Sequence, residues 1–301
     1  MTQTLQGIAP ISHLGVIRVQ GEDAASFLHG QLTNDFALLK QDHARLAAFC
    51  SAKGRMQASF IGFKRAPDDI VLIVSRDLLA QTLKRLSMFV LRAKAKLSDA
   101  SNDFQLYGLI SSAVPDAQQA PWSLQTQGQA HIVQLYPVAG QPRALWVAPT
   151  GTPAPEAPAL SEAQWRWSEV ASGIATVSLP VYELFVPQML NYESVGGVNF
   201  KKGCYPGQEV VARSQFRGTL KRRAYLVHAA QELTAGMEVF AASDAEQAAG
   251  TVVQAAPAPD GGWDAVVSMQ TSAAQEALTA GTADGASLAL LPLPYALLED
   301  I

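Results

Sequence analysis

The stretch NFKKGCYPGQEVVARSQFRGTLKRR, residues 199–223, brings a thiol, a sharp bend and a carboxylate within a few positions of one another. Cys204 follows Lys201 and Lys202, and cationic neighbours raise the thiolate fraction of a cysteine. A reactive thiol is one interpretation. A small buried hydrophobic residue is the other, because free cysteines are among the most buried residue types. Cys50, in the apolar context AAFCSA, favours the buried interpretation.

The same stretch indicates a tight backbone turn. Gly203 and Gly207 flank the cysteine, and Pro206 fixes its own φ angle between them. Such a segment suits either a plain turn or a close approach of the backbone to a ligand. Gln208 and Glu209 then offer amide and carboxylate groups that can pair with adjacent N–H donors of a heteroaromatic ring. Glu209 equally suits the start of a helix or a salt bridge.

The composition of the whole chain excludes several classes of protein. Its 301 residues, 49% of them hydrophobic, can fill one large core or two to three modest domains. With 26 acidic and 22 basic residues, the total charge predicts no general affinity for nucleic acid or an anionic membrane. The start, MTQTLQGIAPISH, does not read as a signal peptide, and no run of about 18 apolar residues occurs. We expect a soluble, cytoplasmic protein.

Two cysteines and five scattered histidines predict no resident metal. A structural zinc usually takes four Cys or His ligands, and an iron–sulfur cluster typically takes four thiolates. The two cysteines also exclude a disulfide framework and fit a reducing compartment. If the protein takes part in cluster chemistry, we expect it to act as a helper.

Hydrophobic periodicity predicts an α+β unit of order β-α-β-β-β-α at the front of the chain. The strand LGVIRV (14–19) is followed by a helix opened by residues 21–23. A hairpin of RLAAFC (45–50) and RMQASFIGF (55–63) turns at Gly54. IVLIV (70–74) and the amphipathic helix DLLAQTLKRLSMFVLR (77–92) complete the unit.

Residues 104–173 favour a second unit of the same kind. Three further strand candidates, FQLYGLI (104–110), AHIVQLY (130–136) and RALWVAP (143–149), surround a polar loop at 113–128. Ser161 and Gln164 form a capping-box pattern, and the helix that they open should end at Gly173.

After about residue 220 the pattern changes to short strands separated by turns. These are RAYLVHA (223–229), MEVFA (237–241), GTVVQA (250–255), WDAVVSM (263–269) and SLALL (287–291), with helical periodicity only around QEAL (275–278). This pattern is typical of a small β-barrel. We expect a front region over 1–215, made of two similar subdomains, and a barrel domain over 216–301.

The segment KGCYPGQE (202–209), continued by VVAR and FRG, resembles the KGCYxGQE signature of the YgfZ branch of the folate-binding proteins related to the glycine-cleavage T-protein. GEDAASFLHGQLTND (21–35), CSAKGRM (50–56) and ELFVPQMLNYESVGGVNF (183–200) resemble the same family in the same order. The resemblance covers roughly residues 10–230, and the final barrel rests on its strand pattern alone.

The resemblance implies a T-protein-like fold of ferredoxin-like α+β subdomains around a central opening that binds tetrahydrofolate or a one-carbon derivative, plus a C-terminal β-barrel. It also implies a role in the assembly or maintenance of iron–sulfur enzymes, including those that thiolate tRNA. Cys204 is then the working thiol and Lys202 the residue that tunes it. The candidate folate-binding residues are Gln188, Asn191, Tyr205, Gly207, Gln208, Glu209, Arg213 and Arg217.

The chain departs from the T-protein where that protein carries catalytic acids. Aligned from the glycine turn, the positions of its acidic pair hold Ala58 and Ser59, and the position of its pterin-binding glutamate holds Ala171. Neither Ala58 nor Ser59 can act as a carboxylate base. These losses speak against ordinary aminomethyl transfer. They leave Glu209, Gln188 or Asn191 as substitute anchors for the pterin.

The anionic glutamyl tail of a folate needs cations, which Arg213, Arg217 and the cluster Lys221–Arg223 can provide. That cluster can equally be a solvated surface stripe. Direct contact with a tRNA backbone is a third use, although its footprint of charge is small.

Three functions remain open. The first is a folate-binding accessory factor for iron–sulfur proteins, the second a folate-dependent aminomethyltransferase or demethylase, and the third a tRNA- or protein-binding module that keeps only the fold. The first predicts that the Cys204 sulfur faces a solvent-reachable cavity walled by both front subdomains. The partner enzyme, the one-carbon form of the folate and the oligomeric state are not encoded in any motif.

Overall fold

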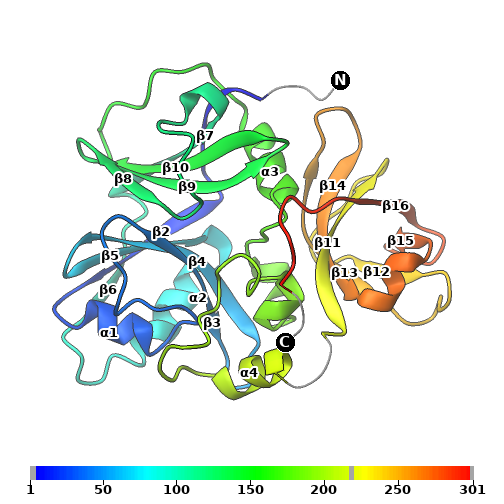
Figure 1. The fold of residues 1–301 in the computed structure, drawn as a ribbon, viewed down its shortest axis with the longest axis horizontal. Helices are drawn as coiled ribbons and strands as arrows, with labels where there is room; N and C mark the ends of the chain where they lie inside the picture. Colours follow the sequence, from blue (N-terminus) through cyan, green and yellow to red (C-terminus); the bar gives the residue numbers. More distant parts are fainter. Residues whose placement is uncertain (1–4, 217–219, 299–301) are drawn as a thin grey trace.

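The computed structural model describes residues 5–216 and 220–298, which form two five-stranded antiparallel sheets and a closed barrel (Figure 1). The first sheet has the strand order β3 (Ala44–Cys50), β4 (Met56–Ala66), β5 (Asp69–Ser75), β2 (Leu14–Gln20) and β6 (Lys96–Asp99). Helices α1 (Ala24–His29) and α2 (Arg76–Ser87) belong to the same unit. The predicted order β-α-β-β-β-α is confirmed, and Gly54 sits in the hairpin turn with φ +71°.

Helix α2 is shorter than the periodicity predicted. Helix α1 ends at His29, with Gly30 as its C-cap. Helix α2 ends at Ser87, whereas the pattern extended to residue 92. Beyond Ser87 the chain must turn back to form β6 beside β2, and Leu91, which the predicted helix included, is 86% exposed.

The second sheet has the order β1 (Gly7–Pro10), β7 (Phe104–Ile110), β10 (Gln141–Pro149), β9 (Ala130–Val138) and β8 (Leu124–Gln127). Helix α3 (Glu162–Ala171) opens with the predicted capping box, in which Ser161 and Gln164 bond reciprocally. Gly173 follows its C-cap with φ +69°. The strands β1, β6 and β8 were not predicted, because each has only four residues and lies at an edge of its sheet, where alternation is too short to register.

The two sheets share one hydrophobic core. Side chains of both sheets and of α3 pack into a single cluster. The ring of Phe63 on β4 stacks on that of His131 on β9, with centroids 5.3 Å apart. The backbone N–H of Ala44 donates to the carbonyl of Trp122 at 2.8 Å. The front sheets therefore meet through packed side chains as well as backbone bonds.

An irregular segment with two short 3₁₀ helices, η2 (Leu179–Val181) and η3 (Pro187–Leu190), leads to α4 (Gln208–Phe216). The barrel closes in the order β11 (Arg222–Ala229), β14 (Trp263–Gln270), β13 (Gly250–Pro257), β12 (Glu238–Ala241), β15 (Leu278–Ala280) and β16 (Ala286–Leu291). The predicted barrel is confirmed. The helical pattern around QEAL is split between η4 (Thr271–Gln275) and the start of β15.

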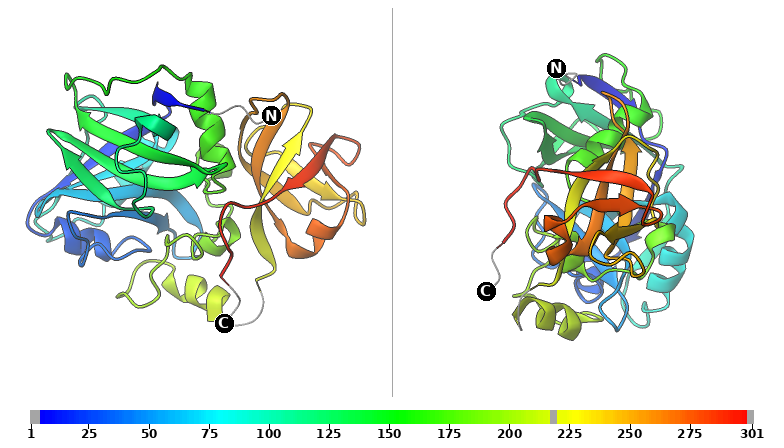
Figure 2. Two further views of the ribbon diagram at one scale, coloured as in Figure 1. Left: turned by 45° about the horizontal axis from the view of Figure 1, so that its top comes forward. Right: turned by 90° about the vertical axis from the view of Figure 1, so that its right-hand side faces the viewer.

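Helix α3 lies between the second sheet and the barrel (Figures 1 and 2). The indole N–H of Trp167 on α3 donates to Asp264 on β14 at 2.7 Å. The side-chain amide of Asn191 donates to the carbonyl of Ala224 on β11 at 2.8 Å. Among the helices that the structure describes, none is long and apolar enough to cross a membrane.

Candidate functional site

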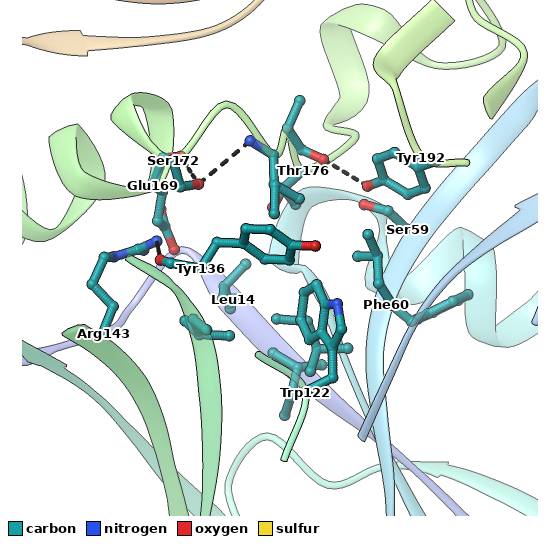
Figure 3. A pocket seen from close by; sticks show the side chains of 16 residues that line it. Leu14, Ser59, Phe60, Trp122, Tyr136, Arg143, Glu169, Ser172, Thr176 and Tyr192 are labelled. Carbon is teal, nitrogen blue, oxygen red and sulfur yellow. Dashed lines mark hydrogen bonds between the residues drawn. The ribbon is translucent and has the colours of Figure 1, made fainter. Parts of the chain in front are cut away.

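A pocket lies at the centre of the front region, where both sheets and α3 meet (Figure 3). Its interior volume is about 60 Å³, and the open space around its mouth brings the total to about 580 Å³. It is lined by Leu14, Leu46, Ser59, Phe60, Ile61, Ile73, Trp122, Leu135, Tyr136, Arg143, Glu169, Ser172, Ile174, Ala175, Thr176 and Tyr192. Apolar walls with a few polar groups are typical of a small-molecule site.

Two aromatic rings form one wall of the pocket. Trp122 and Tyr136 lie with their centroids 5.9 Å apart, tilted by 59°. The indole N–H of Trp122 donates to the carbonyl of Val195 at 2.9 Å, and its backbone N–H donates to Gln134 at 2.8 Å. These bonds hold the indole in a segment that the sequence indicated only as a polar loop. The rings offer faces on which a flat heteroaromatic ring can stack.

Glu169 is the one carboxylate among the described residues that line the pocket. It lies on α3, where its Oε1 accepts the indole N–H of Trp165 at 2.9 Å. Its Oε2 lies 2.8 Å from Nε2 of His13. Burial lowers the pKa of His13, but the charge and hydrogen bond of Glu169 outweigh burial, so the pKa is raised overall. The pocket therefore holds a carboxylate that is fixed in place and that favours protonation of the imidazole beside it.

Arg143 supplies a second charge beside Glu169. The guanidinium is buried, donates to the hydroxyl of Ser168 at 3.0 Å and stands over the ring of Trp165 at 4.7 Å. Burial lowers the pKa of Arg143 to about 10, although the nearby charge of Glu169 opposes this shift. Figure 3 shows Arg143 and Glu169 on one side of the pocket, with Ser59 and Tyr192 on the other.

Ala58 and Ser59, the positions that the resemblance aligns with an acidic pair, lie on β4 and face opposite sides. Ser59 lines the pocket, and its hydroxyl accepts the backbone N–H of Val177 at 2.9 Å. Ala58 is buried in the separate core beneath α1 and α2. Ala171 packs against the shared core and does not line the pocket, whereas Glu169, two positions earlier on α3, does.

Sequence reasoning missed Glu169, Trp122, Tyr136 and Arg143. Glu169 carried a usable signal, because it lies four residues after Trp165 and therefore on the same face of the helix. The other three lie in strands or a loop where only the pairing of distant strands brings them together.

The turn around Cys204 packs against the β3–β4 hairpin through glycines. Gly207 has φ +79°, and a Cβ there would lie 2.4 Å from the carbonyl oxygen of Ser51 and 2.7 Å from Cα of Gly54. A Cβ on Gly54 would lie 2.9 Å from Cβ of Val210 on α4. Close approach does explain these glycines. The approaching groups belong to the protein itself: the hairpin backbone at Gly207 and the Val210 side chain at Gly54.

Cys204 is exposed on this turn, and Cys50 is buried as predicted. Burial raises the pKa of Cys50 to about 12. Lys202 is buried, with Nζ 4.5 Å from the ring centroid of Tyr205 and donating to the carbonyl of Gly203 at 3.1 Å. Burial lowers the pKa of Lys202 to about 8 against the opposing charges of Asp35 and Cys204.

The last residue of α1 and the segment after it contribute two polar partners to this turn. Nδ1 of His29 lies 3.0 Å from Oδ1 of Asp35, and a Cβ on Gly203 would lie 3.2 Å from Nε2 of His29. Burial raises the pKa of Asp35, but the backbone N–H of Leu38 and the ring of His29 outweigh it and lower the pKa overall. Asp35 is therefore an ionised group close to both His29 and Lys202.

The remaining predicted ligand residues do not line the central pocket. Gln188 is buried and donates to the carbonyl of Val211 at 2.7 Å, and Asn191 bonds to β11. Glu209 is largely exposed and pairs with Arg213 at 2.8 Å along α4. Gln208 is the first residue of α4, and Tyr205 is buried beside Lys202. Arg217 lies outside the described residues.

The three residues of the basic cluster at the barrel entrance, Lys221–Arg223, differ in burial and in hydrogen-bond partners. Arg223 is buried and pairs with Glu193 at 2.8 Å. Arg222 donates to the carbonyl of Ala249 at 3.1 Å, and Lys221 is exposed. Lys221 is thus the member of this cluster that faces solvent most openly.

The thiol and the pocket are two separate places. Neither Cys204 nor Lys202 lines the central pocket, although the thiol is exposed as expected. The expectation that the sulfur faces the cavity walled by both subdomains is therefore not met. In the described ranges, no group of three or more His, Cys, Asp or Glu residues could hold a metal ion.

Several known proteins are similar to this chain in sequence or in fold. No protein-family model matches the chain. It is 31% identical to a tRNA-modifying protein YgfZ of Edwardsiella ictaluri over 93% of this chain and 89% of that protein. It is 28% identical to a protein of the same name from Colwellia psychrerythraea over 74% of this chain and 71% of that one. The glycine cleavage aminomethyltransferase T of Bartonella henselae has a similar fold, with a TM-score of 0.65 and 15% identity over 98% of this chain and 87% of that one.

Proposed function

The chain belongs to the YgfZ family, and we propose that it is a tetrahydrofolate-binding accessory factor that supports tRNA modification by iron–sulfur enzymes. The observation that carries this proposal is the chemistry of the central pocket. It combines two aromatic faces with one fixed carboxylate, and it has a serine where an aminomethyltransferase needs an acid. We place its action in the cytoplasm, because both cysteines are free thiols.

The pocket's residues fit a pterin. The ring is flat and presents adjacent N–H donors, which match the carboxylate of Glu169 as acceptor and the rings of Trp122 and Tyr136 as stacking partners. A bound folate would supply a carrier for one-carbon units. The charge of Arg143 and the hydrogen bond of His13 hold the Glu169 side chain in one orientation, so that it needs no reorganisation when it accepts hydrogen bonds.

The absence of a carboxylate at position 59 favours an accessory role over transfer chemistry. The Ser59 hydroxyl is committed to the backbone N–H of Val177, and a serine cannot stabilise a cationic iminium as an aspartate could. Turnover of an aminomethyl or methylamine donor by the purified protein would instead favour the aminomethyltransferase or demethylase alternative.

We assign the working thiol to a surface position that a partner macromolecule can reach. Cys204 is exposed on a turn that Gly54 and Gly207 lock against the hairpin. Lys202 lies close enough to Cys204 for the two groups to interact electrostatically. Iron–sulfur enzymes or their assembly machinery are the proposed partners. Direct binding of tRNA is a weaker proposal, because Lys221 and Arg213 offer only a small patch of exposed charge.

Complementation in cells tests the proposal. Cells that lack this protein and depend on it for tRNA thiolation would receive the wild type, Cys204→Ser, Glu169→Gln or the control Glu156→Gln, whose carboxylate is exposed in the connector before α3. The thiolated nucleosides of their tRNA would be measured by mass spectrometry. We expect losses with Cys204→Ser and Glu169→Gln alone. Full restoration by both variants would remove the thiol and the pocket from the function.

A further inference from the structure

His13 lies where the chain crosses between the two front sheets, at the end of the β1–β2 connection. Its carbonyl accepts the backbone N–H of Arg76, the first residue of α2, at 2.9 Å. The carbonyl of Ser12 accepts Nε of the same arginine at 2.7 Å. The backbone on which His13 stands is therefore held by α2, while its ring reaches α3.

The imidazole bridges two carboxylates of α3. Nε2 lies 2.8 Å from Glu169, and Nδ1 lies 3.3 Å from Glu162. The Ser12 hydroxyl bonds to Glu162 as well, at 2.7 Å. The charged groups around the ring are Glu162, Arg166 and Glu169 from α3 and Arg76 from α2, with Arg143 of β10 acting on Glu169 from the pocket side.

Glu169 forms part of the wall between two hollows. It lines the central pocket, and it also lines a groove of about 570 Å³ between the front region and the barrel. Thr176 lines both as well. His13 lines the groove and not the central pocket. The imidazole can therefore exchange protons with solvent from the groove while its partner carboxylate faces the ligand.

We propose that His13 is a positioning residue of the folate pocket, which sets the orientation of the Glu169 side chain and the net charge of the His13–Glu169 pair and so makes ligand affinity depend on pH. This inference rests on the proposed function. While the ring is protonated, its charge compensates the carboxylate. When the proton leaves through the groove, the Glu169 carboxylate becomes a stronger acceptor for the N–H donors of a pterin.

The test is calorimetric titration of tetrahydrofolate into the full-length protein between pH 6 and 8.5. We expect the wild-type dissociation constant to fall about fivefold across this range. A fivefold change corresponds to about 1 kcal/mol, the interaction energy of one nearby unit charge that is removed when His13 loses its proton. His13→Gln keeps a hydrogen-bond donor but no titrating group, so its affinity should be constant with pH. The ligand's own titration is common to both proteins.

A second variant acts on His13 from outside the pocket. Glu162→Gln removes a carboxylate that raises the pKa of His13, so it should move the midpoint of the affinity change to lower pH. His43→Gln is the matched control, because His43 pairs with Asp42 elsewhere on the surface.

The outcomes separate this inference from the proposed function. No binding by the wild type at any pH would overturn the folate pocket itself. Binding with the same pH profile in the wild type, His13→Gln and Glu162→Gln would overturn the role of His13 alone.

Discussion

Gly207→Ala should be one of the most destabilising single-methyl additions in this chain. The added Cβ would lie 2.4 Å from the carbonyl oxygen of Ser51 and 2.7 Å from the backbone of Gly54, and these backbone atoms cannot rotate away. The residue must also keep φ near +79°, which costs an L-residue about 1–2 kcal/mol. Forcing the turn away from the hairpin adds about 1–3 kcal/mol of overpacking. We expect a total loss of about 2–5 kcal/mol.

Gly140→Ala is the matched control. Gly140 has φ +74°, but a Cβ there would meet no atom within 4 Å. It should lose only the conformational part, about 1–2 kcal/mol. Both variants and the wild type would be unfolded in urea and followed by tryptophan fluorescence, and free energies would be compared at equal slopes. Equal losses of stability for the two variants would refute the packing explanation for Gly207. They would favour the alternative that this glycine allows the backbone to approach a ligand.

Three further perturbations test individual groups. Burial raises the pKa of Glu162, but bonds from a hydroxyl, a guanidinium and an imidazole outweigh it and lower the pKa to about 2. The stabilisation of the fold by ionised Glu162 is therefore present above about pH 4.5 and is lost as pH falls toward 2. Glu162→Gln should lower the free energy of unfolding by about 1–2 kcal/mol at pH 7 and should have no effect near pH 2. Thermal unfolding at the two pH values measures both. The Cε resonance of Lys202 should titrate with a midpoint near 8, and Asp35→Asn should lower that midpoint because the Asp35 charge raises it; a midpoint above pH 10 would contradict the burial of this lysine. Asn191→Ala should cost about 2–3 kcal/mol in urea unfolding, because it leaves the backbone groups of Ala224 unpaired at the barrel contact; a loss below 0.5 kcal/mol would show that water replaces the amide.

Periodicity was a sufficient guide to the long elements. The alternation of β2, the hairpin at Gly54 and the capping box of Ser161 are local signals, and each formed as predicted. The fold class, inferred from the resemblance to the T-protein, is confirmed by the structural match. Short edge strands such as β8 could not be predicted from periodicity. The four residues of β8 acquire a strand conformation only by pairing with β9.

The candidate site was less accessible to sequence reasoning. The KGCYPGQE motif identified the exposed thiol and the buried lysine, but it could not show that the turn packs on the hairpin instead of the pocket. The pocket itself is assembled from distant segments. Glu169 lies on α3, Trp122 comes from the loop before β8, and Ser59 lies on β4. Their meeting depends on how the two sheets pack, which no local pattern encodes.

The most direct test of the account is the affinity of tetrahydrofolate for the wild type, Glu169→Gln and Cys204→Ser, measured by calorimetry at one pH. Loss of a charged hydrogen-bond acceptor should weaken binding by about tenfold or more in Glu169→Gln. Cys204→Ser should bind as tightly as the wild type, because the thiol lies outside the pocket. Binding that is unchanged in Glu169→Gln and lost in Cys204→Ser would contradict the assignment of pocket and thiol to two separate places.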